Sequence, residues 1–297
     1  MRNAIALTMS RMRLAMRNRL FLVFSLIMPL IFFFLFLGLF ARGNPAALPP
    51  AFGQVIALTV MGNFWGLSVQ LVTFREQGIL RRFRLAPIGP SAMLISSIIA
   101  NYILTLPTLL IEFILAIAVF HMHSFGNLFG VFILATLGVV SFASLGLIIA
   151  SVTNTMQETQ IINQIIWLGF LFLSGATLPL AMLPNFVQIG ALFLPATYLV
   201  NGLQLALAES MSITALLPAT ISLLGTTVIA FALSVQLFRW DPSEKASRKS
   251  KLWALSAIIP FLLLGTWEAL WHGDLRESSQ AVYSYLEHGS PQKEAPH

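Results

Sequence analysis

The run FREQGILRRFRLAPIGP, residues 74–90, lies between two long apolar stretches and decides how both are interpreted. Its ionised side chains are Arg75, Glu76, Arg81, Arg82 and Arg84. Apolar residues alternate with these charges, and a plain solvated turn would not need them. We therefore predict a short amphipathic helix over residues 75–86 that is ended by Pro87 and docks in a groove of a partner protein.

The composition around this run is that of a membrane protein. The chain has 297 residues, of which 57% are hydrophobic and 9% charged, and its mean hydropathy is +0.84. A soluble domain carries roughly 25% charged residues, so a bilayer is the expected solvent. The net charge of +6 lies beside apolar runs and indicates membrane topology rather than nucleic-acid binding. The absence of cysteine excludes disulfides, thiol catalysis and Cys-ligated metals.

Apolar runs of about 20 residues indicate membrane-crossing helices. Candidate spans lie near residues 20–41, 52–74, 92–120, 125–150, 158–175 and 214–238. A seventh candidate, 252–271, is interrupted by Pro260 and Glu268. Residues 176–213 are apolar but broken by prolines, which predicts short helices that re-enter the membrane rather than one straight span.

Basic residues indicate the orientation of the chain. Residues 1–19 place arginines opposite an apolar stripe, which predicts an amphipathic helix lying in the membrane interface. A signal peptide is the alternative, but the apolar run that follows is longer than the roughly 7–15 residues of a signal peptide. Lys and Arg gather in 1–19, 75–84 and 239–251, so we expect these segments, and the N-terminus, to be cytoplasmic. Residues 241–297 would then form a cytoplasmic loop, the seventh span and a polar tail.

Two motifs resemble those of a known family. Glu76-Gln77-Gly78, followed by Pro87, resembles the E-x-G…P signature that ABC-2 type transporter permeases carry between their second and third spans. Residues 173–203 are similar to the family's stretch after the fifth span. The matching residues there are Ser174, Gly175, Pro179, Pro184, Pro195 and Tyr198. With the basic N-terminal helix, the resemblance covers residues 1–240.

The resemblance implies an all-α, six-span permease body of the ABC-2, type V exporter-like kind, as in drug or antibiotic efflux. Such a permease pairs with a second copy and with two ABC ATP-binding subunits, and residues 75–90 would be its coupling helix. The residues implied to couple it to the ATPase are Glu76, Gly78, Ile79, Leu80, Phe83 and Pro87. The apolar three would fill a cleft of the ATPase, Gly78 would allow close approach, and Glu76 would satisfy free N–H groups at the start of the short helix.

The sequence lacks the groups that would hydrolyse ATP. No G-x-x-x-x-G-K-[ST] motif occurs, so we expect ATP and Mg²⁺ on the partner subunit and no cofactor on this chain. No G-x-S-x-G motif with recognisable partners occurs, and we predict no catalytic residue. His121 and His123 lack carboxylate support, so no metal site is expected.

Polar residues inside the predicted spans are few. Glu112, in the third span, is either a substrate contact or a packing residue, and as a buried charge it would be expensive. The remaining candidates for a substrate pathway are Asn63, Phe64, Gln70, Asn163, Gln164 and Trp167. The amides among them would either line the pathway or clasp neighbouring helices.

These expectations favour the membrane subunit of an ATP-driven exporter for hydrophobic or amphipathic molecules in the bacterial plasma (inner) membrane. A permease for lipid-linked polysaccharide is the nearest alternative. An ion-coupled transporter or channel with Glu112 as proton relay would carry inverted repeats and several intramembrane carboxylates, and we find neither in the sequence. A membrane anchor without transport would leave residues 176–213 without a purpose.

Overall fold

The computed structural model describes residues 8–9, 12–13, 19–40, 45–83, 89–208, 216–241, 243–244, 246–268, 279–280 and 283. These residues form helices, turns and loops, and none of them is in a β-strand. Of the predicted interfacial helix, only residues 8–9, 12–13 and 19 are described, and each is helical. Pro87, residues 209–213 and most of the polar tail lie outside the described residues.

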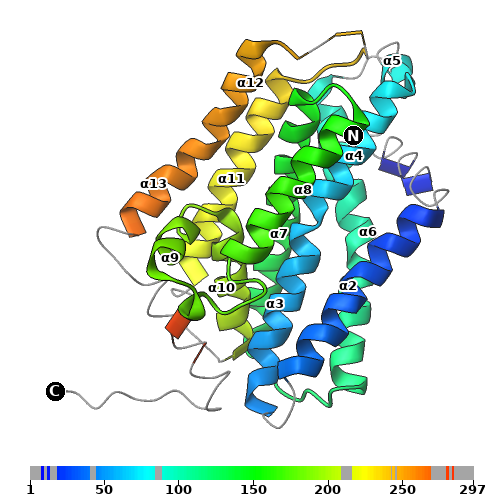
Figure 1. Ribbon diagram of the computed structural model, residues 1–297. Helices are drawn as coiled ribbons and strands as arrows, with labels where there is room; N and C mark the ends of the chain where they lie inside the picture. The colour runs from blue at the N-terminus through cyan, green and yellow to red at the C-terminus, as the bar shows by residue number, and fades with distance from the viewer. Residues whose placement is uncertain are drawn as a thin grey trace.

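Long helices run side by side along the molecule (Figure 1). Their bounds are α2 Arg19–Phe40, α3 Leu48–Met61, α4 Asn63–Glu76, α6 Pro90–Ala118, α7 Leu128–Val152, α8 Met156–Leu173 and α11 Leu217–Gln236. The shorter helices are α5 Ile79–Phe83, α9 Asn185–Ala191, α10 Pro195–Ala208, α12 Arg248–Leu255 and α13 Ile259–Trp267. Helix α5 lies at one end of the bundle, and α9 and α10 lie toward the other.

A helix occupies the place of each of the six predicted spans. Among the described residues, four helices are long and apolar enough to cross a membrane. They are Leu48–Glu76 (α3 and α4 together), Pro90–Ala118, Leu128–Val152 and Leu217–Gln236. Helices α9 and α10, bent by 95°, become a fifth if counted as one broken span. The apolar part of α2 covers Leu26–Leu39, and α8 begins with a polar turn, so a count of six or seven crossings stays a prediction.

Glycines bring helix backbones into direct contact at the centre of the bundle. Helix α7 packs against α4 and α11, and α10 packs against α3. A Cβ added at Gly146 of α7 would lie 2.3 Å from the carbonyl oxygen of Phe64 in α4. A Cβ added at Gly53 of α3 would lie 2.8 Å from the carbonyl oxygen of Leu203 in α10. Both pairs of helices are therefore as close as their backbones allow.

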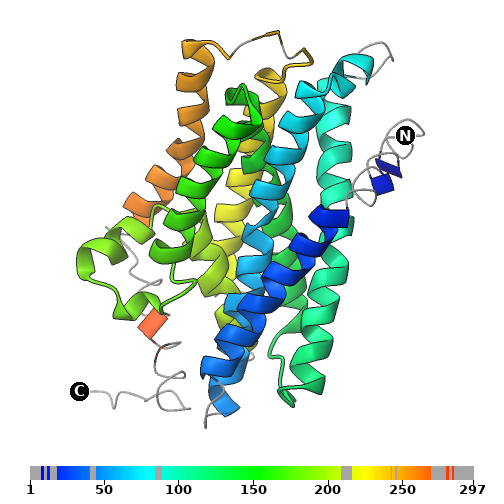
Figure 2. The same cartoon turned by 45° about the vertical axis from the view of Figure 1, so that its right-hand side comes forward.

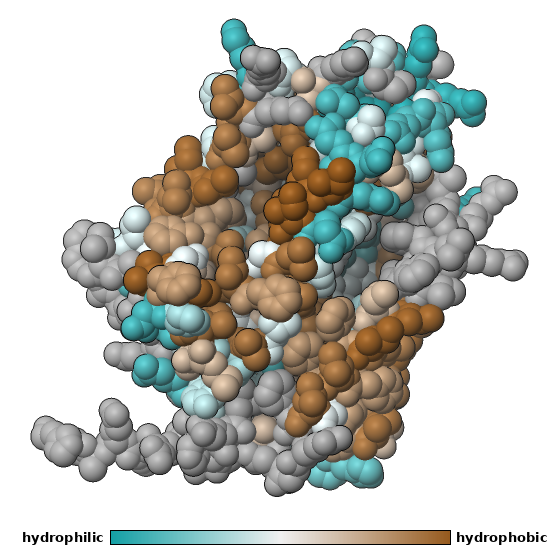
Figure 3. Space-filling view, in the orientation of Figure 1, coloured by the Kyte–Doolittle hydropathy of each residue, from teal (hydrophilic) through white to brown (hydrophobic). Residues whose placement is uncertain are grey.

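The surface of the bundle is apolar along its flank. Figure 3 shows hydrophobic side chains over the body of the molecule and hydrophilic ones gathered at the α5 end. On α8, for example, Ile161, Ile165 and Phe172 are each more than half exposed. A water-soluble surface rarely carries so continuous an apolar patch. This belt and the span-length helices are those of a multi-pass membrane protein.

The predicted seventh span is built from short pieces. Helices α12 and α13 are joined by the 3-10 turn Ser256–Ile258 and run beside α11 (Figure 1). Gly265 of α13 faces the ring of Phe193, where an added Cβ would lie 2.4 Å from a ring carbon. The C-terminal part of the chain thus packs on the segment between α9 and α10.

Candidate functional site

A cavity of about 560 Å³ lies between α2, the α3–α4 rod, α6 and α8. Its apolar lining includes Met28, Pro29, Phe32, Trp65, Leu104 and Trp167. Its polar lining consists of Thr59, Asn63, Asn101, Thr105, Thr108 and Gln164. Pockets for drug-sized ligands typically measure about 300–1,000 Å³ and are mostly apolar with a few placed polar groups. The cavity therefore has the size and lining of a small-molecule site.

Asn63 holds the polar side of the cavity together. Its Oδ1 accepts hydrogen bonds from Asn101 Nδ2 (2.6 Å) and Thr105 Oγ1 (2.7 Å) of α6. Its Nδ2 donates to the carbonyl oxygens of Thr59 (3.3 Å) and Val60 (2.9 Å), beside the break between α3 and α4. Asn63 therefore lines the cavity and clasps two helices at the same time.

Glu112 lies one helical turn beyond the part of α6 that lines the cavity. Asn101, Thr105, Thr108 and Glu112 are spaced four, three and four residues apart, which places them on one face of α6. Thr59 Oγ1 donates a 2.6 Å hydrogen bond to Glu112 Oε1. The Glu112 side chain is 0% exposed, and its Oε2 has no hydrogen-bond partner among the described residues. Glu112 does not itself line the cavity, but its partner Thr59 does.

The other predicted pathway residues divide into two groups. Gln164 and Trp167 of α8 line the cavity. Phe64 is buried in the core, where its ring packs against Phe170 (centroids 5.6 Å apart). Asn163 is buried and donates a 2.8 Å hydrogen bond to Ser68 of α4, and Gln70 is half-buried outside the lining. Phe64 and Asn163 therefore hold helices together, and none of these three residues borders the cavity.

Sequence reasoning missed four polar lining residues, Thr59, Asn101, Thr105 and Thr108. The three on α6 share the helical spacing of Glu112, so the face they form could have been found from the sequence. Thr59 could not, because its role depends on a contact between helices 53 residues apart in sequence.

The predicted coupling helix differs from the expectation of a single helix. Helix α4 continues to Glu76, and α5 begins only at Ile79. Gly78 lies between them with φ +68°, and a Cβ added there would meet nothing within 4 Å. Within this chain, Gly78 is therefore required by the left-handed backbone of the turn and not by a close approach.

The turn also changes which apolar residues face outward. Leu80 is 0% exposed and packs in the chain's own core with Leu71, Met93 and Leu147. Ile79 and Phe83 are half-buried at the edge of this cluster. The expectation that all three apolar residues fill a partner's cleft is thus wrong for Leu80, since the rotation at Gly78 turns it inward.

Arg75 and Glu76 form hydrogen bonds with the ends of two other helices. Arg75 is buried and donates to the carbonyl oxygens of Ala150 (2.8 Å) and Thr153 (2.6 Å) at the end of α7. Glu76 Oε1 accepts from the backbone N–H of Met156 (2.8 Å), the first residue of α8. A cation at a helix C-terminus and an anion at a helix N-terminus both stabilise the helix dipole. Glu76 therefore caps α8 instead of the short helix for which it was expected.

The segment after α11 reaches the same turn. Arg239 donates to the carbonyl oxygens of Ser151 (2.9 Å) and Thr153 (2.6 Å) and to Asn154 Oδ1 (3.1 Å). Burial lowers the pKa of Arg239, and the nearby carboxylates of Glu244 and Glu158 oppose that shift. Asp241 forms a 3.8 Å ion pair with the exposed Arg81 of α5. Helices α4, α5, α7, α8 and α11 are thus tied together at this end of the bundle.

The motif after the fifth predicted span forms a tight bend. Gly175 has φ +84°, Pro184 precedes α9, and Pro195 begins α10. The hydroxyl of Tyr198 donates a 3.0 Å hydrogen bond to the carbonyl oxygen of Leu192, across the 95° bend between α9 and α10. Gln54 of α3 donates a 3.1 Å hydrogen bond to the Gly175 carbonyl. Side-chain hydrogen bonds therefore hold both the loop at Gly175 and the bend between α9 and α10.

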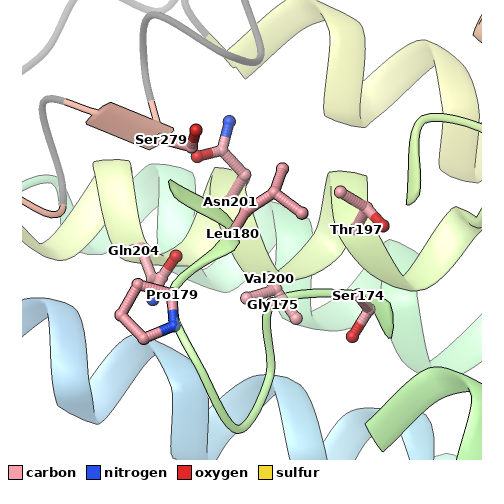
Figure 4. A pocket seen from close by; sticks show the side chains of 9 residues that line it. All are labelled: Ser174, Gly175, Pro179, Leu180, Thr197, Val200, Asn201, Gln204 and Ser279. Atoms are coloured by element: carbon pink, nitrogen blue, oxygen red, sulfur yellow. The ribbon is translucent and has the colours of Figure 1, made fainter. Parts of the chain in front are cut away.

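Figure 4 shows how this bend packs on α10. Ser174, Gly175, Pro179 and Leu180 of the bend lie opposite side chains of α10, and Ser279 approaches from the C-terminal segment. The space that they enclose is about 10 Å³, which is roughly the room of one water molecule. The loop and α10 therefore pack directly against each other here and leave no room for a ligand.

Comparison with known proteins identifies the family. A family model described as ABC-2 type transporter matches residues 2–208, more than half of the chain. The search of curated proteins found no match. In the described part of the chain, no group of three or more His, Asp or Glu side chains could hold a metal ion. The family match, with the all-helical fold and its membrane-length helices, confirms the family prediction: the chain belongs to the ABC-2 type transporter family, as a permease component that pairs with an ABC ATP-binding subunit.

Proposed function

We propose that this chain is the permease subunit of an exporter for hydrophobic or amphipathic molecules of the drug, antibiotic or lipid-like kind. The cavity of about 560 Å³ carries the proposal, because its lining is mostly apolar with a polar side and suits one such molecule. The same size favours a small amphipathic substrate over a lipid-linked polysaccharide. ATP and Mg²⁺ are bound by the separate ATP-binding subunits.

The working assembly is a homodimer of this chain with two ATP-binding subunits in the bacterial plasma membrane, with six spans in each permease body and a cytoplasmic N-terminus. The concentration of Lys and Arg at the α5 end supports this orientation. The exposed apolar face of α8, which includes Ile161 and Ile165, gives a second copy a surface on which to pack.

Helix α5 is the coupling contact in this proposal. Ile79 and Phe83 remain as its apolar contacts, and the exposed Arg81 and Arg82 form the rim. Glu76, at the end of α4 beside α5, accepts a hydrogen bond from the first residue of α8, a helix that lines the cavity. A displacement of α5 by the ATPase would therefore be passed to α8, which carries Gln164 and Trp167.

Phe83→Ala is expected to loosen the ATP-binding subunit by about 1–3 kcal/mol or to abolish substrate stimulation of its ATPase, because central apolar anchors dominate such interfaces. Arg82→Ala is the matched control on the same short helix, and as a rim residue it should change binding by less than about 1 kcal/mol. Both are measured by pull-down of the ATPase and by ATP hydrolysis with and without substrate. Unchanged binding and stimulation in Phe83→Ala would reduce this segment to a solvated turn.

The proposed function is tested by purifying the detergent-solubilised complex and weighing it by native mass spectrometry. We expect two copies of this chain and two of an ATPase. The same complex in proteoliposomes should move a neutral hydrophobic dye only when ATP is present. A monomer that transports without a nucleotide-binding partner would contradict the proposal.

A further inference from the structure

Glu112 is a buried acidic group for which the described residues provide no charged partner. It lies within α6, its Oε1 is held by Thr59, and its Oε2 is without a hydrogen bond among the described residues. The ion pair found in the described residues, Arg81–Asp241, lies at the α5 end of the bundle and does not involve it. A carboxyl group at membrane depth costs several kcal/mol when it is charged and unpaired. An ionisable side chain at membrane depth more often belongs to a functional site than serves only to pack helices.

The position of Glu112 links it to the cavity. The polar face of α6 passes from Asn101 through Thr105 and Thr108, which line the cavity, to Glu112 one helical turn further on. The Thr59 hydroxyl lies in the lining and bonds Oε1 directly. Threonine populates two side-chain rotamers in helices, and the other rotamer of Thr59 would release Glu112 Oε1 to a ligand in the cavity.

The rest of the lining suits the body of an apolar cation. Asn63 uses its amide on protein partners, so it offers little to a ligand. Trp65 and Trp167 present indole rings, which attract cations through their faces and pack against apolar groups. An ammonium group beside Glu112 and a hydrophobic body against these rings would satisfy both parts of the cavity.

We propose that the cavity selects lipophilic amines, with the Glu112 carboxylate as the counter-ion of the ligand's ammonium group. This inference rests on the proposed function, because it names the substrate class of the same cavity. The ammonium supplies the hydrogen-bond donor that Oε2 lacks, and the pair removes the cost of a lone buried charge.

The test compares two probes of nearly equal shape, 9-anthracenylmethylamine and 9-anthracenylmethanol. The affinity of each probe for the full chain is measured in lipid nanodiscs at pH 7, and the uptake by empty nanodiscs is subtracted. We expect the wild type to prefer the amine by about 10-fold, and Glu112→Gln to lose this preference while its affinity for the alcohol stays within about 2-fold. Retained alcohol binding also shows that the variant is folded.

A control variant separates the carboxylate from the loss of a charge elsewhere. Glu244→Gln makes the same chemical change at an exposed position of the α5 end and should keep the preference for the amine. Equal binding of the two probes by the wild type, or an unchanged preference in Glu112→Gln, would overturn the inference.

A second measurement needs no variant. Dicyclohexylcarbodiimide, a lipophilic reagent for buried carboxyl groups, should label Glu112, and mass spectrometry of the peptide reports the rate. The amine should slow this labelling and the alcohol should not; equal protection by both would also overturn the inference. ATP-driven export of the alcohol by the whole complex tests the proposed function separately, so either idea can fail without the other.

Discussion

Gly146→Ala is expected to be among the most destabilising single-methyl changes in the bundle. The new Cβ would lie 2.3 Å from the carbonyl oxygen of Phe64 and 2.9 Å from its Cα, so it meets backbone rather than a side chain that can turn away. Overpacking of a tight core typically costs about 1–3 kcal/mol, and a clash between two backbones belongs at or above the upper end. The measurement is the midpoint of thermal unfolding in detergent, followed by size-exclusion chromatography.

Gly225→Ala is the matched control for this prediction. Gly225 lies in α11, and a Cβ added there meets nothing within 4 Å. The replacement should therefore leave stability unchanged or raise it by about 0.5–1 kcal/mol, because glycine costs that much in a helix relative to alanine. If the two variants unfold at the same temperature, α4 and α7 do not touch through their backbones.

Arg75→Met is expected to lower the free energy of unfolding by about 2–4 kcal/mol, since hydrogen bonds to charged groups contribute about 1.5–3 kcal/mol and orphaned buried acceptors add a cost. Arg75 is 2% exposed, and the Ala150 carbonyl oxygen would lose the 2.8 Å bond from its guanidinium. Thr153 O keeps its bond from Arg239, which limits the loss. Chemical denaturation in mixed micelles measures the effect.

Arg82→Met is the control for the loss of a positive charge. Arg82 is exposed on α5, so the same substitution should change the free energy of unfolding by less than about 0.5 kcal/mol. The free energy of unfolding of Arg75→Lys should fall between those of the wild type and Arg75→Met. A single ammonium group on an unbranched side chain does not reproduce both guanidinium hydrogen bonds. Equal stability of Arg75→Met and Arg82→Met would mean that the end of α7 needs no external cation.

Apolar run length predicted the places of the long helices well. The run expected near 92–120 became Pro90–Ala118, and that near 214–238 became Leu217–Gln236. Hydrophobicity alone specifies these elements, because a helix is how an apolar segment satisfies its backbone in lipid. The break at Gly62 was missed, since both halves of the rod are apolar and the interruption is one residue long.

The site was harder to predict because it depends on contacts between distant residues. A helical wheel over 75–86 treated the coupling segment as one helix, and the turn at Gly78 changed the direction in which Leu80 points. Glu76 accepts a hydrogen bond from the backbone of a residue 80 positions away, and no local sequence pattern predicts such a contact. In contrast, the polar face of α6 that ends in Glu112 has a regular spacing and was open to prediction.

Helix α2 gives the cavity a wall that is a single helix thick. It lies beside α3 and α6, at the edge of the bundle in Figure 1 and across its front in Figure 2. Met28, Pro29 and Phe32 line the cavity, while Ile27 and Ile31 of the same helix are exposed. Pro29 cannot donate to the helical hydrogen-bond ladder, which weakens α2 at this point of the wall. A molecule that crosses the wall here comes from the bilayer, where a lipophilic compound is far more concentrated than in water. If the proposed substrate class is right, the bilayer would act as the reservoir that fills the cavity, and an affinity that looks weak against the aqueous concentration would be enough to keep it occupied.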